Sequence, residues 1–137
     1  MSLVSRILEK LSTRFKKQKP QIDYFFGGRK SIELWVKPYS MHFHREDGPA
    51  YQRWHSTGRK NFEVWIFDNI NHRIEGPHFT EWNVYGDVIN ESWRINCKPI
   101  KNPELYKSWL IKHNLFEKPY SKWTDDEKLL WRLSWNL

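Results

Sequence analysis

The sequence has one cysteine, Cys97, and no run of about 18 consecutive apolar residues. A single cysteine cannot form an internal disulfide, so the disulfide-stabilised scaffolds of small secreted proteins are excluded. The lack of a long apolar run excludes a membrane-spanning helix. Arg6 and Glu9 interrupt the apolar stretch at the N-terminus, so we expect no secretory signal. These absences favour a protein of a reducing compartment, in which Cys97 is a small buried apolar side chain.

The short motifs of common enzymes are also missing. The sequence contains no G-x-S-x-G, no P-loop, no H-E-x-x-H and no C-x-x-C. These absences disfavour the commonest hydrolases, nucleotide-binding enzymes, zinc proteases and redox enzymes. We therefore assign no catalytic residue, no metal ligand, no cofactor and no small-molecule substrate from a motif.

Tryptophan is abundant by contrast, with nine in 137 residues, and aromatic residues make up 17% of the chain. So aromatic a chain can bury enough area to offset its ordering entropy, which excludes general disorder. The formal net charge is +7, but its distribution is uneven. Residues 1–30 hold eight Lys or Arg and two Asp or Glu, whereas residues 31–100 hold eight and nine. The basic charge therefore belongs to the N-terminal segment and not to the middle of the chain.

The middle of the chain is repetitive. The element G-x-x-x-x-E-x-W occurs three times, and the element H-R-x-[DE]-G-P occurs twice, 28 residues apart. An aromatic residue precedes each repeated glycine by four positions. We interpret as structural the repeat positions Gly28, Glu33, Trp35, His44, Arg45, Asp47, Gly48, Gly58, Glu63, Trp65, His72, Arg73, Glu75, Gly76, Gly86, Glu91 and Trp93.

Each copy has the pattern of a β-hairpin, with the glycine as a turn residue of positive φ. Glu and Trp of E-x-W are two residues apart and so share one face of a strand. In the H-R-x-[DE]-G-P loop, glycine is expected to take a strained backbone conformation. Arg45 and Arg73 are expected to pair with the loop carboxylate or to stack on a repeat tryptophan. The same two arginines are the expected partners of a column formed by Glu33, Glu63 and Glu91.

The alternation of these two elements resembles the short tandem repeats of many tailed-phage and giant-virus proteins, which are distantly similar to MORN repeats. The resemblance covers roughly residues 24–96 and implies a viral protein with a stacked-hairpin fold, in the virion or the cytoplasm of the infected cell. MORN repeats are shorter and have a different Tyr/Gly pattern, so their lipid binding is not carried over. The residues that carry the resemblance are Gly28, Glu33, Trp35, His44–Ala50, Gly58, Glu63, Trp65, His72–Pro77, Gly86, Glu91 and Trp93.

The N-terminal segment, residues 1–19, has the pattern of a basic amphipathic helix that Pro20 ends. Three interpretations fit this segment: a helix packed on the sheet, a docking helix for a partner, or an arm for nucleic acid or a membrane surface. Its apolar positions are Leu3 or Val4, Ile7, Leu8, Leu11 and Phe15. Its candidate partner-binding residues are Arg6, Lys10, Arg14 and Lys17.

Residues 101–137 have the pattern of two helices. Asn102 is an expected N-cap followed by proline, with Leu105, Trp109 and Leu110–His113 on one side. A capping box, Thr124–Glu127, begins the second helix. The apolar stripe expected on that helix is Leu129, Leu130, Leu133 and Leu137. Trp131 and Trp135 form a second apolar edge, which either helps to cap the sheet or anchors another subunit.

The sequence also contains three weaker chemical patterns. His42, His44 and His72 could meet as a metal site, but two of them are repeat positions with a structural interpretation. Glu63 and Glu91 could lie at a separation that a carboxylate hydrolase uses. The pairs Arg53–Trp54 and Trp93–Arg94 could stack single-stranded bases, although the repeat region lacks a basic stripe.

The sequence thus predicts an α+β protein with three parts. Residues 1–19 form a basic amphipathic helix or arm, residues 20–100 an antiparallel stack of three β-hairpin repeats with a MORN-like sheet, and residues 101–137 a helical cap. The predicted function is that of a non-enzymatic viral interaction or structural protein. Its partner would be a second copy, a virion component or a host factor. The alternatives are a nucleic-acid-binding protein that uses the N-terminal arm and, less favoured, a carboxylate hydrolase.

Overall fold

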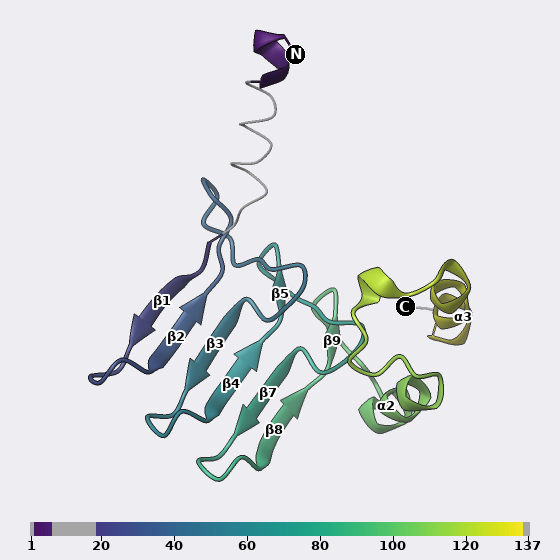
Figure 1. Ribbon diagram of the computed structural model, residues 1–137. Coiled ribbons are helices and arrows are strands. Elements are labelled where there is room, and N and C mark those ends of the chain that lie inside the picture. Colours follow the sequence, from purple (N-terminus) through teal and green to yellow (C-terminus); the bar gives the residue numbers. More distant parts are fainter. Residues whose placement is uncertain (1, 7–18, 136–137) are drawn as a thin grey trace.

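A computed structural model of the chain describes residues 2–6 and 19–135. It shows an α+β fold with an antiparallel sheet, in which the long described helices come late in the chain (Figure 1). The sheet has six strands in the order β1-β2-β3-β4-β7-β8. Their bounds are β1 (Gln21–Tyr24), β2 (Lys30–Leu34), β3 (Tyr51–Trp54), β4 (Lys60–Val64), β7 (Phe79–Trp82) and β8 (Val88–Ser92). The strands pair in chain order as three hairpins, whose turns point to the same end of the sheet.

The three hairpin turns have the same geometry. Gly28, Gly58 and Gly86 have φ angles of +95°, +95° and +91°, a conformation that glycine adopts without steric cost. In each turn the amide three residues before the glycine donates to the carbonyl of the residue after it, at 2.8, 2.8 and 2.9 Å. The glycine of G-x-x-x-x-E-x-W is therefore the turn residue of each hairpin.

The register gives the sheet one polar row that crosses five strands. This row consists of Glu33, Gln52, Glu63, Thr80 and Glu91. Glu33, Gln52 and Thr80 are buried, whereas Glu91 on the edge strand β8 is exposed. Buried polar side chains need partners, because an unsatisfied one destabilises the fold.

The partners of the buried glutamates come from their own strands. Glu33 accepts hydrogen bonds from Lys30 Nζ at 3.4 Å and from Trp35 Nε1 at 2.9 Å. The next copy repeats both contacts, at 2.9 and 3.4 Å. The prediction that Arg45 and Arg73 would neutralise this column is therefore wrong. A bulge near the turn, where the register shifts by one residue, brings the lysine three positions earlier onto the glutamate's face.

Two short hairpins follow the second and third tryptophans of E-x-W. They are β5 (Ile66–Phe67) with β6 (Ile70–Asn71), and β9 (Arg94–Ile95) with β10 (Lys98–Pro99). Their two-residue turns, Asp68-Asn69 and Asn96-Cys97, have positive φ at every position. Cys97 is exposed in its turn, so the prediction of a buried thiol is wrong.

The main hydrophobic core lies between the end of the sheet and the C-terminal helices. These are α2 (Pro103–Lys112), the short 3-10 helix η1 (Tyr120–Lys122) and α3 (Asp125–Trp135). Both predicted caps are present. Asn102 Oδ1 accepts from the amide of Leu105 at 3.1 Å, and Thr124 and Glu127 exchange bonds of 2.9 and 3.1 Å. The hydrogen bond from the Thr124 amide holds the pKa of the Glu127 carboxyl below its usual value.

The buried faces of the two helices differ from those expected. On α2 the buried residues are Tyr106 and Leu110, and Leu105 is exposed. On α3 the leucine stripe is on the outside, since Leu129, Leu130 and Leu133 are exposed, and Leu137 lies outside the described residues. The core residues are Ile74, Trp93, Ile95, Ile100, Tyr106, Leu110, Leu115, Trp123 and Trp131.

Trp131 is consequently a core residue, which agrees with the capping alternative and not with its alternative role as a partner-binding candidate. Trp135 is half-buried and packs against the same core, with its ring 4.9 Å from that of Tyr106. The two indoles lie inward because a large flat side chain buries more apolar area than a leucine at the same site.

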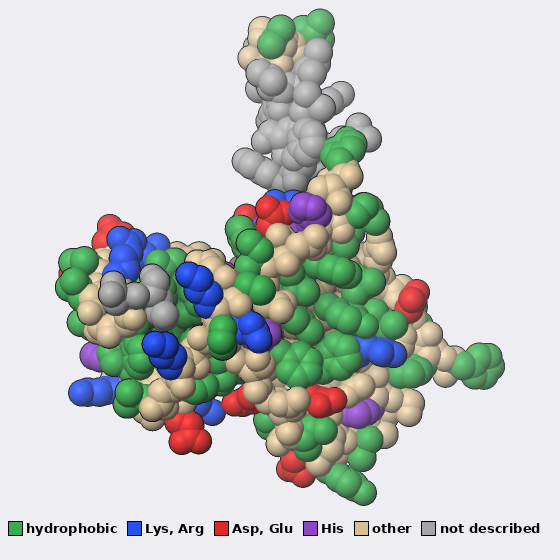
Figure 2. Space-filling model, turned by 180° about the vertical axis from the view of Figure 1, so that it is seen from behind, with side chains coloured by type: hydrophobic (Ala, Val, Ile, Leu, Met, Phe, Trp, Pro, Cys, Tyr) green, Lys and Arg blue, Asp and Glu red, His purple; other side chains and the backbone are tan. Residues whose placement is uncertain are grey.

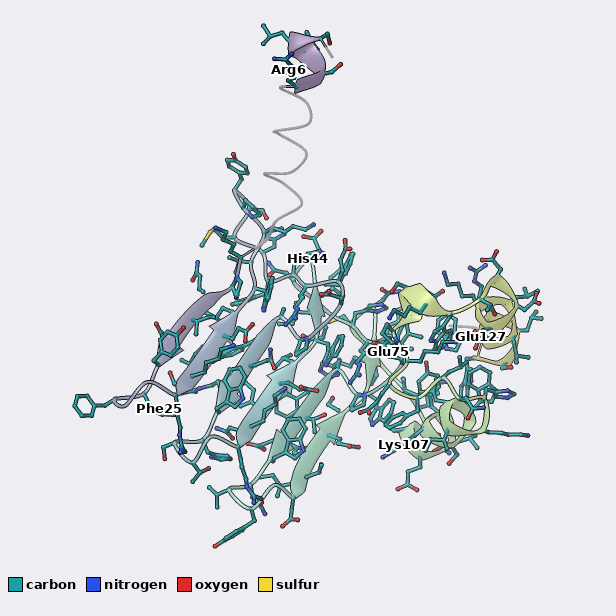
Figure 3. The ribbon with its side chains drawn as sticks, viewed as in Figure 1. Arg6, Phe25, His44, Glu75, Lys107 and Glu127 are labelled. Carbon is teal, nitrogen blue, oxygen red and sulfur yellow. The ribbon has the colours of Figure 1, made fainter. Side chains whose placement is uncertain are left out.

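At the N-terminus, residues 3–6 are helical, and Leu3 and Val4 are exposed. Arg6, the last described residue of this segment, is also exposed (Figure 3). The other basic candidates, Lys10, Arg14 and Lys17, lie outside the described residues. Within the described part of the chain, no helix has both the length and the apolar character needed to cross a bilayer.

Candidate interaction surface

The H-R-x-[DE]-G-P loops hold an arginine flat against a tryptophan. The guanidinium carbon of Arg45 lies 4.2 Å from the ring centroid of Trp35, and that of Arg73 lies 3.9 Å from Trp65. Each arginine also pairs with the loop carboxylate two residues later, at 3.4 Å, and donates to the carbonyl of the loop proline. Ion pairing and stacking were alternatives for the sequence, and the structure contains both. Both arginines therefore serve the fold.

The glycines of the H-R-x-[DE]-G-P loops are required for a reason other than backbone strain. Neither Gly48 nor Gly76 has a positive φ, so the expected strained backbone is wrong. A Cβ at these positions would lie 2.6 Å from Arg45 Cζ and 2.8 Å from Arg73 Cζ. Glycine is present because the arginine folds back over its own loop and leaves no room for a methyl group.

The second loop is buried by the helical cap, and the first is not. Tyr106 Oη donates to the carbonyl of Ile74 at 2.6 Å, and the amide of Glu117 donates to the carbonyl of Glu75 at 2.9 Å. Glu75 lies between the sheet and the cap (Figure 3) and is buried, whereas the side chain of Asp47 is 85% exposed. A cleft of about 270 Å³ lies at the two loops and is lined by their arginine–carboxylate pairs and by residues of η1 and the segment before it.

The repeat histidines make one contact twice. His44 Nδ1 accepts from the amide of Asp68 at 3.1 Å, and His72 Nδ1 accepts from the amide of Asn96 at 3.0 Å. Burial lowers the pKa of both imidazoles, which favours the neutral ring that this contact requires. His42 bonds instead to the carboxylate of Asp68 at 2.8 Å. Among the described residues, no group of three or more His, Cys, Asp or Glu is placed to hold a metal ion.

The residues of the other chemical patterns are mostly engaged in the fold. Glu63 is engaged by Lys60 and by an indole N–H, and β7 lies between it and Glu91. Trp93 is in the core, so it cannot stack an incoming base. Arg53 lies over Phe62 on one face of the sheet, while the neighbouring Trp54 faces the other way, toward two lysines.

The surface that the sequence did not indicate as an interaction site is the face of the sheet opposite the polar row, which we call the open face. A continuous line of aromatic rings crosses it, with centroid distances of 6.4 Å from Phe43 to Tyr51, 5.1 Å from Tyr51 to Phe62 and 6.0 Å from Phe62 to Phe79. These rings are half-buried, except that Phe43 is 36% exposed. Figure 2 shows this side of the molecule, where hydrophobic side chains gather over the middle of the sheet.

No described helix covers the open face, because α2 and α3 stand beside the sheet, beyond β8 (Figure 1). Along each strand, the residues of the open face alternate with those of the polar row. Ile32 and Leu34 of β2 and Val64 of β4 extend the aromatic line, and the two edge strands bear polar residues. A signal for this face was present in the sequence, since apolar residues recur with period two in the first and second copies.

A second, smaller apolar surface lies on α3. Leu129 and Leu133 are 51% and 74% exposed, and Leu130 is 41% exposed. These leucines lie on one helix, whereas the aromatic line of the open face spans three strands and the loop before β3. The open face is therefore the stronger candidate for an interaction surface.

No protein-family model matches the chain, and no curated protein or solved structure matches it either.

Proposed function

We propose that this chain is a non-enzymatic interaction protein that binds another protein through the open face of its sheet. The observation that carries the proposal is the line of aromatic rings from Phe43 to Phe79 on a face that no described helix covers. Aromatic side chains are enriched at the centres of protein interfaces, where they bury a large area at low entropic cost.

The rest of the molecule supports a structural use of its polar residues. The repeat arginines, histidines and buried glutamates all have partners within the repeats. A catalytic site would instead hold a titratable side chain free to reach a substrate. This supports a binding role over the carboxylate hydrolase that the sequence left as an alternative.

The resemblance to phage and giant-virus repeats extends the proposal to a viral setting. The partner would then be a second copy of the chain, a virion component or a host factor. We also propose that the three hairpins are copies of one MORN-like repeat. Support comes from the nearly equal φ angles of the turn glycines. It also comes from the two histidine contacts, in which both the histidines and their amide donors are 28 residues apart.

The test is a capture experiment with matched surface variants. Phe62→Ser removes the central ring of the open face, and Leu133→Ser removes an equally apolar side chain from α3. A protein held by the wild-type chain and by Leu133→Ser, but lost by folded Phe62→Ser, is the expected result. Capture that is indifferent to Phe62 while Leu133→Ser abolishes it would move the binding surface to the helical cap.

A second candidate function rests on the charge of residues 1–30, which is +6. A nucleic-acid-binding arm predicts affinity for single- or double-stranded DNA or RNA that weakens steeply as salt increases. Deletion of residues 1–19 should remove that affinity. Binding that is independent of salt, or unaffected by the deletion, contradicts this function.

A further inference from the structure

The open face has the arrangement of a self-complementary surface. From the strand register, one cross-strand row on this face consists of Ile32, Arg53, Phe62, Glu81 and Asn90. The neighbouring row consists of Leu34, Tyr51, Val64, Phe79 and Ser92. In both rows the central residue belongs to β4, and the apolar character decreases toward the β8 edge.

Two opposite charges flank the centre of the first row. Arg53 and Glu81 are the cross-strand neighbours of Phe62 on β3 and on β7. Within the part of the chain that the structure describes, neither side chain forms an ion pair. The guanidinium of Arg53 lies 5.9 Å from the ring centroid of Phe62 and is exposed. A positive and a negative charge are thus held on either side of one phenyl ring.

We propose that a second copy of this chain covers the open face, related by a two-fold axis that runs parallel to β4. The proposal rests on the protein-binding role given above and names its partner. An axis along β4 exchanges the strands at equal distances on either side of it, so β3 of one copy faces β7 of the other. Arg53 then faces Glu81 of the second copy, and the symmetry makes this pair twice.

The same axis brings the apolar residues together. Tyr51 faces Phe79 of the second copy, and Phe62 and Val64 face their own equivalents. Two sheets that pack face to face lie about 10 Å apart with their strands nearly aligned, which is the distance that interdigitating aromatic side chains fill. A two-fold axis across the strands would instead bring Arg53 toward Arg53 of the second copy, which like-charge repulsion disfavours.

Charge reversal tests this arrangement in the intact chain. With Arg53→Glu, a glutamate at position 53 faces Glu81 of the second copy on both sides of the axis. With Glu81→Arg, an arginine at position 81 faces Arg53 of the second copy in the same two places. Sedimentation velocity from micromolar to submillimolar protein should show a wild-type dimer, and each single reversal should weaken the dimer by about tenfold or more. The control is Lys101→Glu, at an exposed position beyond β8, which should dimerise as the wild type does.

Two combinations distinguish the proposed axis from any other. The double variant Arg53→Glu/Glu81→Arg restores both opposite-charge pairs with exchanged positions, so the dimer should return. An equimolar mixture of the two single variants should form a heterodimer, because each glutamate then faces an arginine. Circular dichroism of every variant checks that the fold is intact.

A wild-type chain that stays monomeric over this range of protein concentration overturns the proposal. The open face would then be covered by residues 1–19 or by another protein. Single reversals that dimerise as strongly as the wild type also overturn it, as does a mixture that fails to assemble. None of these outcomes overturns the protein-binding role itself, which the Phe62→Ser capture experiment decides separately.

Discussion

Arg73 stacks on Trp65 at 3.9 Å while its guanidinium also pairs with Glu75, and both members of the ion pair are buried. The equivalent arginine of the first copy, Arg45, stacks on Trp35 and pairs with Asp47, whose side chain is almost fully exposed. One repeat motif therefore stands in two environments. The difference arises because the helical cap covers only the second loop.

This difference predicts unequal costs for the same substitution. Arg73→Ala leaves the Glu75 carboxylate buried without its partner, so we expect a loss of about 3 kcal/mol in the free energy of unfolding. Arg45→Ala removes a stacked and solvent-screened side chain, and we expect a loss of about 1 kcal/mol. Urea denaturation of both variants measures these losses. Equal losses would contradict the asymmetry.

The close approach of the arginine to its own loop predicts a coupling between two positions. Gly76→Ala introduces a Cβ 2.8 Å from Arg73 Cζ, and we expect a cost of about 1–3 kcal/mol from displacing a packed side chain. In the Arg73→Ala background this obstacle is absent. The added cost of Gly76→Ala should then nearly disappear, and a double-mutant cycle measures the difference. Additive costs would show that the glycine is needed for another reason.

The histidine contacts predict that stability decreases in mild acid. Burial lowers the pKa values of His44 and His72 in the folded chain below their usual value of 6.5. The unfolded chain therefore binds protons at a pH where the folded chain does not, and the free energy of unfolding falls as the pH decreases below about 6.5. His78 is shifted in the same direction, mainly by burial.

Replacing both repeat histidines with glutamine keeps an acceptor for the loop amides and removes the titration. The double variant His44→Gln/His72→Gln should lose stability less steeply than the wild type between neutral pH and about pH 5. Chemical denaturation at a series of pH values makes the comparison. If the two profiles are parallel, the acid sensitivity originates elsewhere.

Tyr106 connects the cap to the second loop and predicts a loss of stability on removal of one oxygen. Its hydroxyl donates to the carbonyl of Ile74 at 2.6 Å and accepts from Trp131 Nε1 at 2.9 Å. Burial raises the pKa of this hydroxyl, so it stays protonated as a donor. Tyr106→Phe leaves both buried partners unsatisfied, and we expect a cost of about 1–3 kcal/mol.

Leu133→Ser is the matched control, because that leucine is exposed on the same cap. Its effect on the free energy of unfolding should stay within about 0.5 kcal/mol. Thermal or urea denaturation followed by tryptophan fluorescence measures both variants. A loss for Leu133→Ser as large as that for Tyr106→Phe would show that the leucine surface is covered in solution.

Local chemistry was the part of this structure that the sequence could predict. The turn glycines, the Asn102 cap and the Thr124–Glu127 capping box all depend on residues a few positions apart, and all are present. The short hairpin at Asp68-Asn69 was missed, although a two-residue turn of this kind is a known signal. Its flanking strands are only two residues long, and the alternation that indicates a strand does not develop over so few residues.

The errors concern packing between distant segments. On α3, leucines and tryptophans occupy adjacent faces, and periodicity alone does not decide which face is buried. Trp131 can be buried because Tyr106, 25 residues away, provides its indole N–H with a buried hydroxyl acceptor. The aromatic line of the open face was missed for a related reason. Tyr51, Phe62 and Phe79 form a line only after three strands have paired in register.

The third copy of the repeat ends differently from the first two. The residue 28 positions after His72 is Ile100, and Asn102-Pro103 begins a helix where the earlier copies continue into the next strand. The first and second copies, in contrast, each lead through an H-R-x-[DE]-G-P loop into the next strand of the sheet. Duplication of residues 51–78 would therefore add one hairpin to the sheet and leave both ends of the molecule as they are. Such a duplication would widen the open face by two strands, so the number of repeats sets the area that is available for binding.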